Sequence, residues 1–214
     1  MKMSLQRCLN LALSIYEDTT EVECTDGINW CLLDHDETIY IAIEGSENWE
    51  DWKTNLNAFW PKTYGSVTAH RGFMNRSIKV FNDIIAKLDE TYRLEHHRVI
   101  NLCGHSLGGA LAQIIGQWVQ GLYREPMVQV YAFGCPPCFG RGYKINCTIK
   151  RFEIDDDPVP KIMNLTPLLR WWFKVLYAQK GFSIRRATAG GLSISDHNME
   201  VYKKAFGRFG ELGQ

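Results

Sequence analysis

The sequence predicts an α/β fold in which a mostly parallel central sheet is flanked by helices. Short β-rich runs, such as 127–133 and 148–154, are set among helix-forming runs along the second half of the chain. Strands that alternate with helices indicate parallel pairing, because parallel strands need a crossover connection. A length of 214 residues, of which 45% are hydrophobic, suits one domain over residues 1–214 with a full core.

The first half of the chain adds an N-terminal helix and a hairpin. The helix is expected over about Leu5 to Tyr16, and two β-like runs, 28–33 and 38–44, are joined by a turn. A tryptophan-rich segment with a short helix should follow, and then a loop to His70. A long helix is predicted over about 71–92, because apolar residues recur on one helical face.

One stretch holds the motif on which the functional prediction depends. A strand-like run, 99–103, leads through Gly104-His105-Ser106-Leu107-Gly108 into a helix-forming run, 110–118. A G-x-S-x-G pattern at such a junction is typical of a nucleophile elbow, in which a tight turn exposes the serine hydroxyl. Ser106 is therefore the candidate nucleophile. The backbone N–H of Leu107, at the helix start, is the first candidate oxyanion donor.

An activated serine needs a histidine base and an orienting carboxylate, and in this arrangement both follow the serine in the chain. His197 is the one histidine after Ser106. The candidate acids are three aspartates just past a strand end, 155–157, with Asp196 as an outsider. Asp157 is favoured because the prolines after it stiffen its turn. The alternative is that these aspartates only cap turns.

Six motifs follow one another in an order that matches a known family. They are Gly45-Ser46 followed by Asp51-Trp52, His70-Arg71-Gly72-Phe73, Gly104 to Ala110, Phe133-Gly134-Cys135-Pro136, Asp157-Pro158-Val159-Pro160, and Asp196-His197 ahead of Tyr202. Over nearly its whole length the sequence resembles the class 3 lipases, the fungal-type triacylglycerol lipase family of α/β-hydrolases. The resemblance implies a serine ester hydrolase, a lipase or esterase. It also implies Ser106 as nucleophile, Asp157 as acid, His197 as base, and an oxyanion hole from Leu107 and Ser46.

Two departures from the family pattern lie near the expected site. Glu44 stands where the family usually has an arginine before the oxyanion-hole glycine, and residues 136–140 replace a Pro-Arg-Val-Gly run. A lid often follows the oxyanion residue in this family, and residues 47–60 occupy that place here. Their aromatic side chains are expected either in a lid or acyl-pocket wall or in the core, and residues 165–177 are a second candidate lid.

Other functions are compatible with parts of the sequence. Cys135-Pro-Pro-Cys138 has the spacing of thiol oxidoreductases, but it follows a late strand rather than opening an early helix. A phospholipase acting at anionic membranes, a serine peptidase and a non-catalytic binding protein on the same fold are further alternatives. Acyl transfer by a serine triad requires no cofactor and no metal ion, and we expect neither.

Charge is unevenly distributed, although the formal net charge is zero and gives no general attraction to nucleic acid. Residues 1–60 hold twelve acids against three bases, whereas residues 158–195 hold six bases and no acid. The aromatic residues of 165–186 are expected either to pack on the core or to contact an anionic membrane beside the active site. The expected partner is a lipid or a small ester.

The remaining sequence features concern location. Seven cysteines scattered through expected helix, strand and loop favour reduced thiols over a disulfide framework. The N-terminal run lacks the long apolar core and cleavage site of a secretory signal. Polar residues interrupt the uncharged stretch 99–123, so we expect no transmembrane helix and a cytoplasmic protein.

Overall fold

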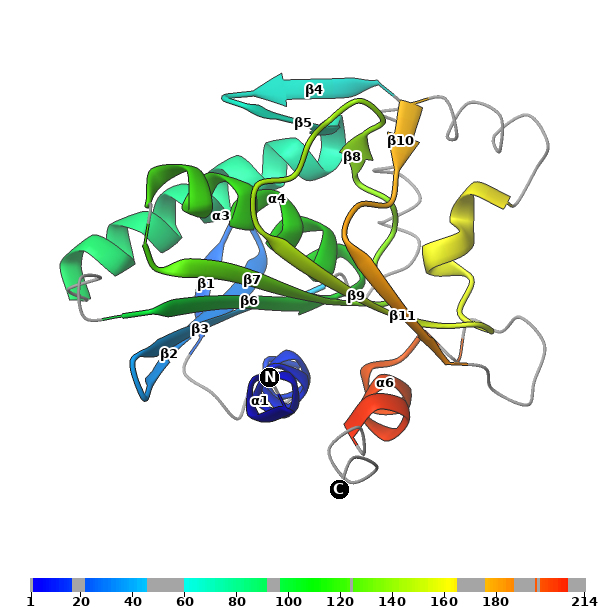
Figure 1. The fold of residues 1–214 in the computed structure, drawn as a ribbon, viewed down its shortest axis with the longest axis horizontal. Coiled ribbons are helices and arrows are strands. Elements are labelled where there is room, and N and C mark those ends of the chain that lie inside the picture. The colour runs from blue at the N-terminus through cyan, green and yellow to red at the C-terminus, as the bar shows by residue number, and fades with distance from the viewer. Residues whose placement is uncertain are drawn as a thin grey trace.

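A sheet of seven strands, counted over the described residues, forms the centre of the molecule (Figure 1). The computed structural model of the protein describes residues 2–16, 22–45, 60–91, 97–123, 125–164, 176–186, 195 and 197–207. The strand order is β1-β2-β3-β6-β7-β9-β11. These strands are β1 (Glu23–Thr25), β2 (Ile28–His35), β3 (Thr38–Ile43), β6 (Val99–His105), β7 (Met127–Phe133), β9 (Thr148–Ile154) and β11 (Phe182–Arg186).

The pairing of these strands is parallel from β3 to β11, and antiparallel where β1, β2 and β3 meet. The predicted mostly parallel sheet and the hairpin of β2 and β3 are therefore confirmed. β1 and β11 add one strand at each edge. Both strands are short, and neither has a long apolar run. Their sequences alone therefore do not predict a strand, which forms because each segment pairs with an adjacent strand.

Helices cover both faces of this sheet (Figure 1). Helices α3 (Arg71–Thr91) and α4 (Ser106–Leu122) lie on one face, and α1 (Lys2–Ser14) and α6 (Met199–Phe206) lie on the other. The core is accordingly divided into two hydrophobic clusters, one on each side of the sheet. Helix α4 is buried from Ser106 to Val119, because it packs against both the sheet and α3. The long helix predicted over about 71–92 is confirmed as α3.

A second, smaller sheet lies over α3 and α4, and the sequence reading did not predict it (Figure 1). Its order is β10-β8-β5-β4, and all of its pairs are antiparallel. Its strands are β4 (Pro61–Tyr64), β5 (Val67–His70), β8 (Phe139–Gly140) and β10 (Tyr177–Ala178). The loop expected before His70 is therefore a hairpin. Strands this short are stable only when segments distant in sequence pair with them.

Four chain segments leave the main sheet at its carboxyl edge and bring polar groups together. They are Glu44 and Gly45 after β3, Ser106 after β6, Gly134 after β7, and residues 155–157 after β9. This edge is where parallel sheets place their reactive groups. Within the described residues, no helix is long and apolar enough to span a membrane.

Candidate active site

Ser106 lies at a strained turn between β6 and α4. Its φ is +53°, in the left-handed region that a non-glycine residue rarely adopts and that costs about 1–3 kcal/mol. A Cβ at Gly104 would lie 2.4 Å from the backbone carbon of Gly108, and a Cβ at Gly108 would lie 2.1 Å from the carbonyl oxygen of Ile43. Both positions therefore require glycine for the close approach of strand and helix. This geometry is that of a nucleophile elbow.

Asp157 and His197 form a hydrogen-bonded pair beside this turn. The carboxylate Oδ2 of Asp157 lies 2.8 Å from Nδ1 of His197, and the Asp157 side chain is completely buried. The ring centroid of His197 lies 4.4 Å from that of His105, the residue directly before Ser106. The structure thus pairs the predicted acid with the predicted base and sets the ring of the base against the residue before the predicted nucleophile.

The other candidate acids and histidines lie elsewhere. Asp155 and Asp156 are half-exposed in the turn before Asp157, and Lys161 lies 3.9 Å from Asp155. Among the described histidines, the ring nitrogens of His35 and His97 contact Asp36 and Asp34. His70 packs against Phe73 and Tyr177. Asp196 lies outside the described residues.

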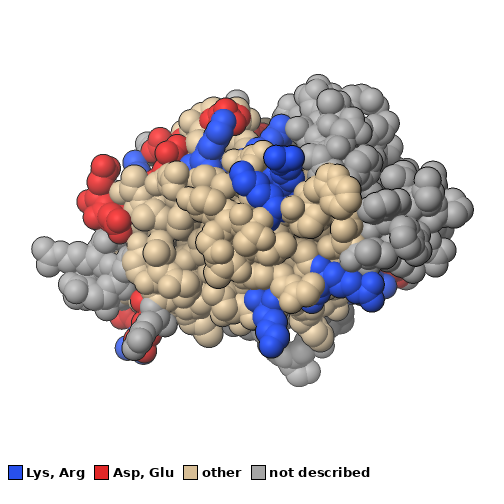
Figure 2. Space-filling view, turned by 90° about the horizontal axis from the view of Figure 1, so that it is seen from above, with Lys and Arg blue, Asp and Glu red and all other residues tan. Residues whose placement is uncertain are grey.

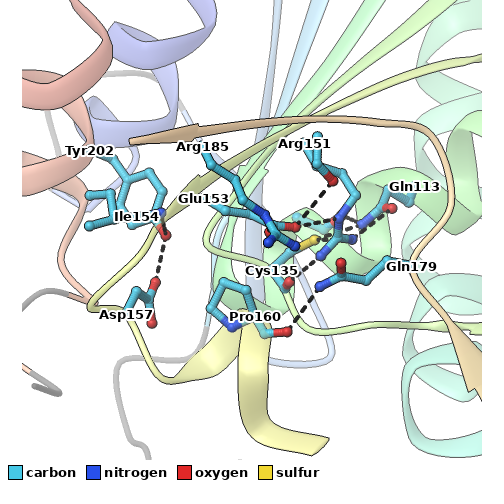
Figure 3. A network of polar contacts seen from close by, with 12 residues as sticks. Gln113, Cys135, Arg151, Glu153, Ile154, Asp157, Pro160, Gln179, Arg185 and Tyr202 are labelled. Atoms are coloured by element: carbon cyan, nitrogen blue, oxygen red, sulfur yellow. Dashed lines mark hydrogen bonds and ion pairs between the residues drawn. The ribbon is translucent and has the colours of Figure 1, made fainter. Parts of the chain in front are cut away.

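Tyr202 of α6 is a contact of the acid to which the sequence reading gave no role. Its hydroxyl donates to Oδ2 of Asp157 at 2.6 Å and accepts from the backbone N–H of Ile154 at 3.3 Å (Figure 3). The other carboxylate oxygen of Asp157 accepts from the N–H of Val159 at 2.8 Å. Three groups therefore fix the orientation of the Asp157 carboxylate, namely the Tyr202 hydroxyl, the His197 ring and the N–H of Val159. In the sequence, the one indication of this contact was that Tyr202 follows the predicted base His197 by five residues.

His105 contributes a neutral ring beneath His197. Burial, and secondarily the neighbouring His197, lower the pKa of His105 well below its usual value. The side chain is 6% exposed and also contacts the ring of Tyr202. A neutral ring at this position supports the imidazole of His197 without adding a second positive charge.

The expected oxyanion donors are described in part. Leu107 is buried at the first turn of α4, where backbone N–H groups have no partner within the helix. Ser46 lies outside the described residues, but its neighbour Gly45 lies against the elbow. A Cβ at Gly45 would lie 3.4 Å from Cβ of Ser106, and the N–H of Gly45 donates to the hydroxyl of Tyr16 at 2.8 Å.

A buried arginine connects the elbow helix to the strand that leads to Asp157 (Figure 3). The guanidinium of Arg151 in β9 donates to the carbonyl of Cys135 at 2.6 Å, to Oε1 of Gln113 at 3.2 Å and to Oε1 of Glu153 at 3.0 Å. Burial lowers the pKa of Arg151, but the charge of nearby Glu153 and its hydrogen bond contribute to a net rise in that pKa. The buried cation is therefore compensated, and it fixes α4 relative to β9.

The Cys135–Cys138 pair does not have the properties of a redox-active dithiol. Both side chains are 1% exposed. Burial raises the pKa of Cys135 to about 11, although the nearby Arg151 acts in the opposite direction, and burial also raises the pKa of Cys138. Reactive thiols are exposed and have a lowered pKa. Within the described residues, no group of three or more His, Cys, Asp or Glu side chains is arranged to hold a metal ion.

The sequence matches the family model described as Lipase (class 3) over residues 40–166. It is 33% identical over 82 residues to a lipase from Rhizomucor miehei. The aligned region covers 37% of this chain and 22% of that protein. It is 26% identical over 152 residues to the secreted mono- and diacylglycerol lipase A of Penicillium cyclopium. That alignment covers 68% of this chain and 50% of the relative. The chain thus spans half or less of the length of these curated relatives.

The fold is also similar to that of solved structures. The lipase from Rhizopus microsporus var. chinensis superposes with a TM-score of 0.70 at 18% sequence identity. The similarity covers 92% of this chain and 85% of that one. At this level of identity the similarity concerns the fold, and it confirms the predicted α/β-hydrolase architecture.

Proposed function

Since the chain belongs to the class 3 lipase family, we propose that it is a serine ester hydrolase that cleaves acyl esters of lipids. Ser106 is the proposed nucleophile, His197 the general base and Asp157 the acid that orients it. The observation that carries this proposal is the completely buried Asp157 hydrogen-bonded to His197, whose ring lies on His105 next to the elbow serine.

The first step forms an acyl-enzyme. The Ser106 hydroxyl oxygen attacks the ester carbonyl carbon, and Nε2 of His197 takes the hydroxyl proton. Nδ1–H of His197 donates to Asp157, whose negative charge stabilises the imidazolium. Collapse of the tetrahedral intermediate breaks the bond to the alcohol oxygen, and His197 gives its proton to the leaving alcohol.

The second step releases the acid. Water attacks the acyl-enzyme while His197 again takes a proton, and the serine hydroxyl is restored when His197 returns that proton to Ser106. In both steps the oxyanion is bound by the N–H of Leu107 and, as the resemblance implies, by Ser46. Loss of one such donor costs about 3 kcal/mol of transition-state stabilisation.

The substrate class follows from the relatives, which are lipases of triacylglycerols or of mono- and diacylglycerols by name. We place this chain in the same class of lipid esters. Hydrolysis rates should therefore be measured on p-nitrophenyl esters from acetyl to palmitoyl, on triacylglycerol and on phospholipid, each with and without a dispersed interface. A peptide amide panel separates esterase from peptidase activity.

The triad is tested on a soluble short ester. Ser106→Ala and His197→Ala should each lower kcat by about 10⁶, and Asp157→Asn by about 10⁴, because the three groups act as one unit. Asp155→Asn and Asp156→Asn are matched controls one and two residues away, and they should retain most of the activity. An inactive Asp156→Asn beside an active Asp157→Asn would contradict the assignment of the acid.

Peripheral membrane contact through residues 165–186 is a second part of the proposal. Much of this segment, including residues 165–175 of the candidate lid 165–177, lies outside the described residues, as do residues 47–59 of the other candidate lid. In its described part, Arg185 donates to the buried Glu153 at 3.1 Å and Arg186 lies over the ring of Phe206. Changing Arg170, Lys174, Arg185 and Arg186 to Gln should weaken sedimentation of the Ser106→Ala protein with anionic vesicles.

A further inference from the structure

The end of strand β3 is held between two helices that lie on opposite faces of the main sheet. From one face, Gly108 of α4 approaches so closely that a Cβ added there would lie 2.7 Å from the carbonyl oxygen of Glu44. From the other face, the hydroxyl of Tyr16, just past the end of α1, accepts the backbone N–H of Gly45 at 2.8 Å. Helix α4 is on the side of the sheet that faces the viewer in Figure 2, and α1 is on the far side of that view. The residue before the proposed oxyanion residue Ser46 is therefore fixed from both faces.

No side chain fits between Tyr16 and the elbow. A Cβ at Gly45 would lie 2.5 Å from the hydroxyl oxygen of Tyr16. The same Cβ would lie 2.6 Å from the carbonyl oxygen of His105 and 3.4 Å from Cβ of Ser106. Since these three atoms surround one point, the phenol hydroxyl lies beside the turn that holds the nucleophile. Position 45 requires glycine for this approach, and the hydrogen bond from Gly45 to Tyr16 sets how Gly45 lies against the elbow.

The ring of Tyr16 also contacts the histidine pair beside the elbow. Its centroid lies 6.4 Å from that of His105, with the two ring planes at 73°. The ring of His105 in turn lies 4.4 Å from that of His197. An edge-to-face contact is a favoured arrangement of aromatic rings. The ring of Tyr16 therefore orients the side chain, whereas its hydroxyl holds Gly45, so the two parts of the side chain can be tested separately.

The backbone of Tyr16 is positioned by the buried end of α1. Residues 11–13 and 15 are at most 8% exposed, and they belong to the core cluster on this face of the sheet. The backbone N–H of Tyr16 donates to the carbonyl of Leu13 at 3.0 Å, and that of Ile15 donates to the carbonyl of Leu11 at 3.2 Å. The helical hydrogen bonding thus continues as far as Tyr16. The phenol is therefore carried by a packed segment and not by a free chain end.

We propose that Tyr16 is a positioning residue for the oxyanion side of the active site. By accepting the N–H of Gly45, its hydroxyl fixes the residue before Ser46 and so sets where the Ser46 donor stands when the oxyanion forms. A donor that is held in place beforehand costs no reorganisation during the reaction. The inference rests on the proposed function, which requires the hole. It adds α1 to the elements that build the site, although Tyr16 precedes residues 40–166, which match the family model.

The first test is the turnover of a soluble short ester by Tyr16→Phe. This variant keeps the ring and removes only the acceptor of the Gly45 N–H. Loss of an oxyanion donor lowers kcat by about 10²–10³, and here the donor is displaced and not lost. We therefore expect kcat to fall about tenfold, with KM changed less than about twofold. Tyr131→Phe is the matched control and should keep its kcat, since its buried hydroxyl bonds to Gln129 and Lys150 on the same face of the sheet.

A second measurement isolates the oxyanion. The Ser106 oxygen adds to the carbonyl carbon of an alkyl trifluoromethyl ketone, His197 takes the hydroxyl proton, and the carbonyl oxygen becomes an oxyanion. In Tyr16→Phe the Ki of this compound should rise by about the factor by which kcat/KM falls. The Ki of the matching methyl ketone, which largely remains a carbonyl, should change less than about twofold. A role in folding alone would leave both Ki values unchanged once the folded fraction, measured by urea unfolding, is taken into account.

Several results would overturn the inference. They are an unchanged kcat in Tyr16→Phe, an equal loss of kcat in Tyr131→Phe, and a loss of kcat that leaves the Ki of the trifluoromethyl ketone unchanged. An unfolded Tyr16→Phe protein would also overturn it, because the hydroxyl would then serve the whole fold. A failure of the proposed function has a different signature, namely a wild-type protein that neither hydrolyses the short ester nor binds the trifluoromethyl ketone.

Discussion

At the scale of single residues, the geometry of the candidate site depends on the side chains that contact the proposed triad as well as on the triad itself. Tyr202 donates to the carboxylate of Asp157 and accepts from a buried backbone N–H. His105 lies under His197 and stays neutral, because burial lowers its pKa. Each contact orients one member of the acid–base pair, so each makes a separate prediction.

Removal of the Tyr202 hydroxyl should impair turnover more than substrate binding. In Tyr202→Phe the carboxylate of Asp157 loses a donor and the N–H of Ile154 loses its acceptor. We expect kcat to fall about tenfold with little change in KM, and the free energy of unfolding to fall by about 1–3 kcal/mol. Tyr123→Phe is the control, since its hydroxyl donates to an exposed Asp89. An unchanged kcat in Tyr202→Phe would show that this contact is dispensable.

His105 should make the folded state less stable in mild acid. Its pKa is lowered on folding, so below about pH 6.5 the unfolded state binds a proton that the folded state does not. Stability is therefore lost as pH falls through the unfolded pKa. Between about pH 6.5 and 5 the wild type should lose up to about 2 kcal/mol more than His105→Phe, measured by urea unfolding. His35→Phe, at an exposed histidine, provides the comparison, and parallel pH profiles for wild type and His105→Phe would refute the effect.

At the scale of elements, close contacts and a buried ionic network decide how the elbow helix is placed. Helix α4 approaches β3 so closely that Gly108 meets the carbonyl of Ile43. On its other side, Gln113 and the loop after β7 bond to Arg151 of β9. The elbow is therefore fixed by its neighbours on both sides, in addition to the G-x-S-x-G motif itself.

The glycine contact can be tested by adding one methyl group. Gly108→Ala would place a Cβ 2.1 Å from a backbone oxygen, which cannot move without shifting β3. We expect a loss of more than about 3 kcal/mol of stability or a protein that does not fold. Gly142→Ala is the control, because no atom lies within 4 Å of the Cβ that it adds. Equal unfolding midpoints for the two variants would contradict the close packing.

The stability of the fold should depend strongly on the buried cation of the Arg151 network and only weakly on the exposed cation of Arg185. Arg151→Met leaves Glu153 buried without its inner partner and should cost about 3–5 kcal/mol in urea unfolding. Arg185→Met removes the outer partner of the same carboxylate, whose own side chain is 56% exposed, and should cost about 1 kcal/mol or less. The reverse order of the two losses would show that the network has been assigned wrongly.

At the scale of the whole molecule, the sequence predicted the features that depend on local pattern. The buried strands β6, β7 and β9 and the helix α3 have continuous or periodic apolar residues, and the elbow has its own motif. Ser106, Asp157 and His197 were predicted from motif order, and the structure pairs Asp157 with His197, whose ring lies against His105 next to Ser106. Their chemical roles remain a proposal.

The features that the sequence did not predict depend on long-range pairing. The second sheet consists of strands of two to four residues, such as β8 and β10, which have no hydrophobic period of their own. The bond from Tyr202 to Asp157 joins residues 45 positions apart and requires α6 to pack under β9.

The most direct test of the central claim is the identity of the residue that an organophosphate modifies. Diethyl 4-nitrophenyl phosphate phosphorylates an activated serine, with loss of 4-nitrophenolate, and peptide mass spectrometry locates the adduct. We predict one diethylphosphoryl group on Ser106, loss of ester hydrolysis in proportion to labelling, no adduct in Ser106→Ala and full labelling in Ser195→Ala. Ester hydrolysis that persists without an adduct on Ser106, or that is lost through modification of another residue, would contradict the account.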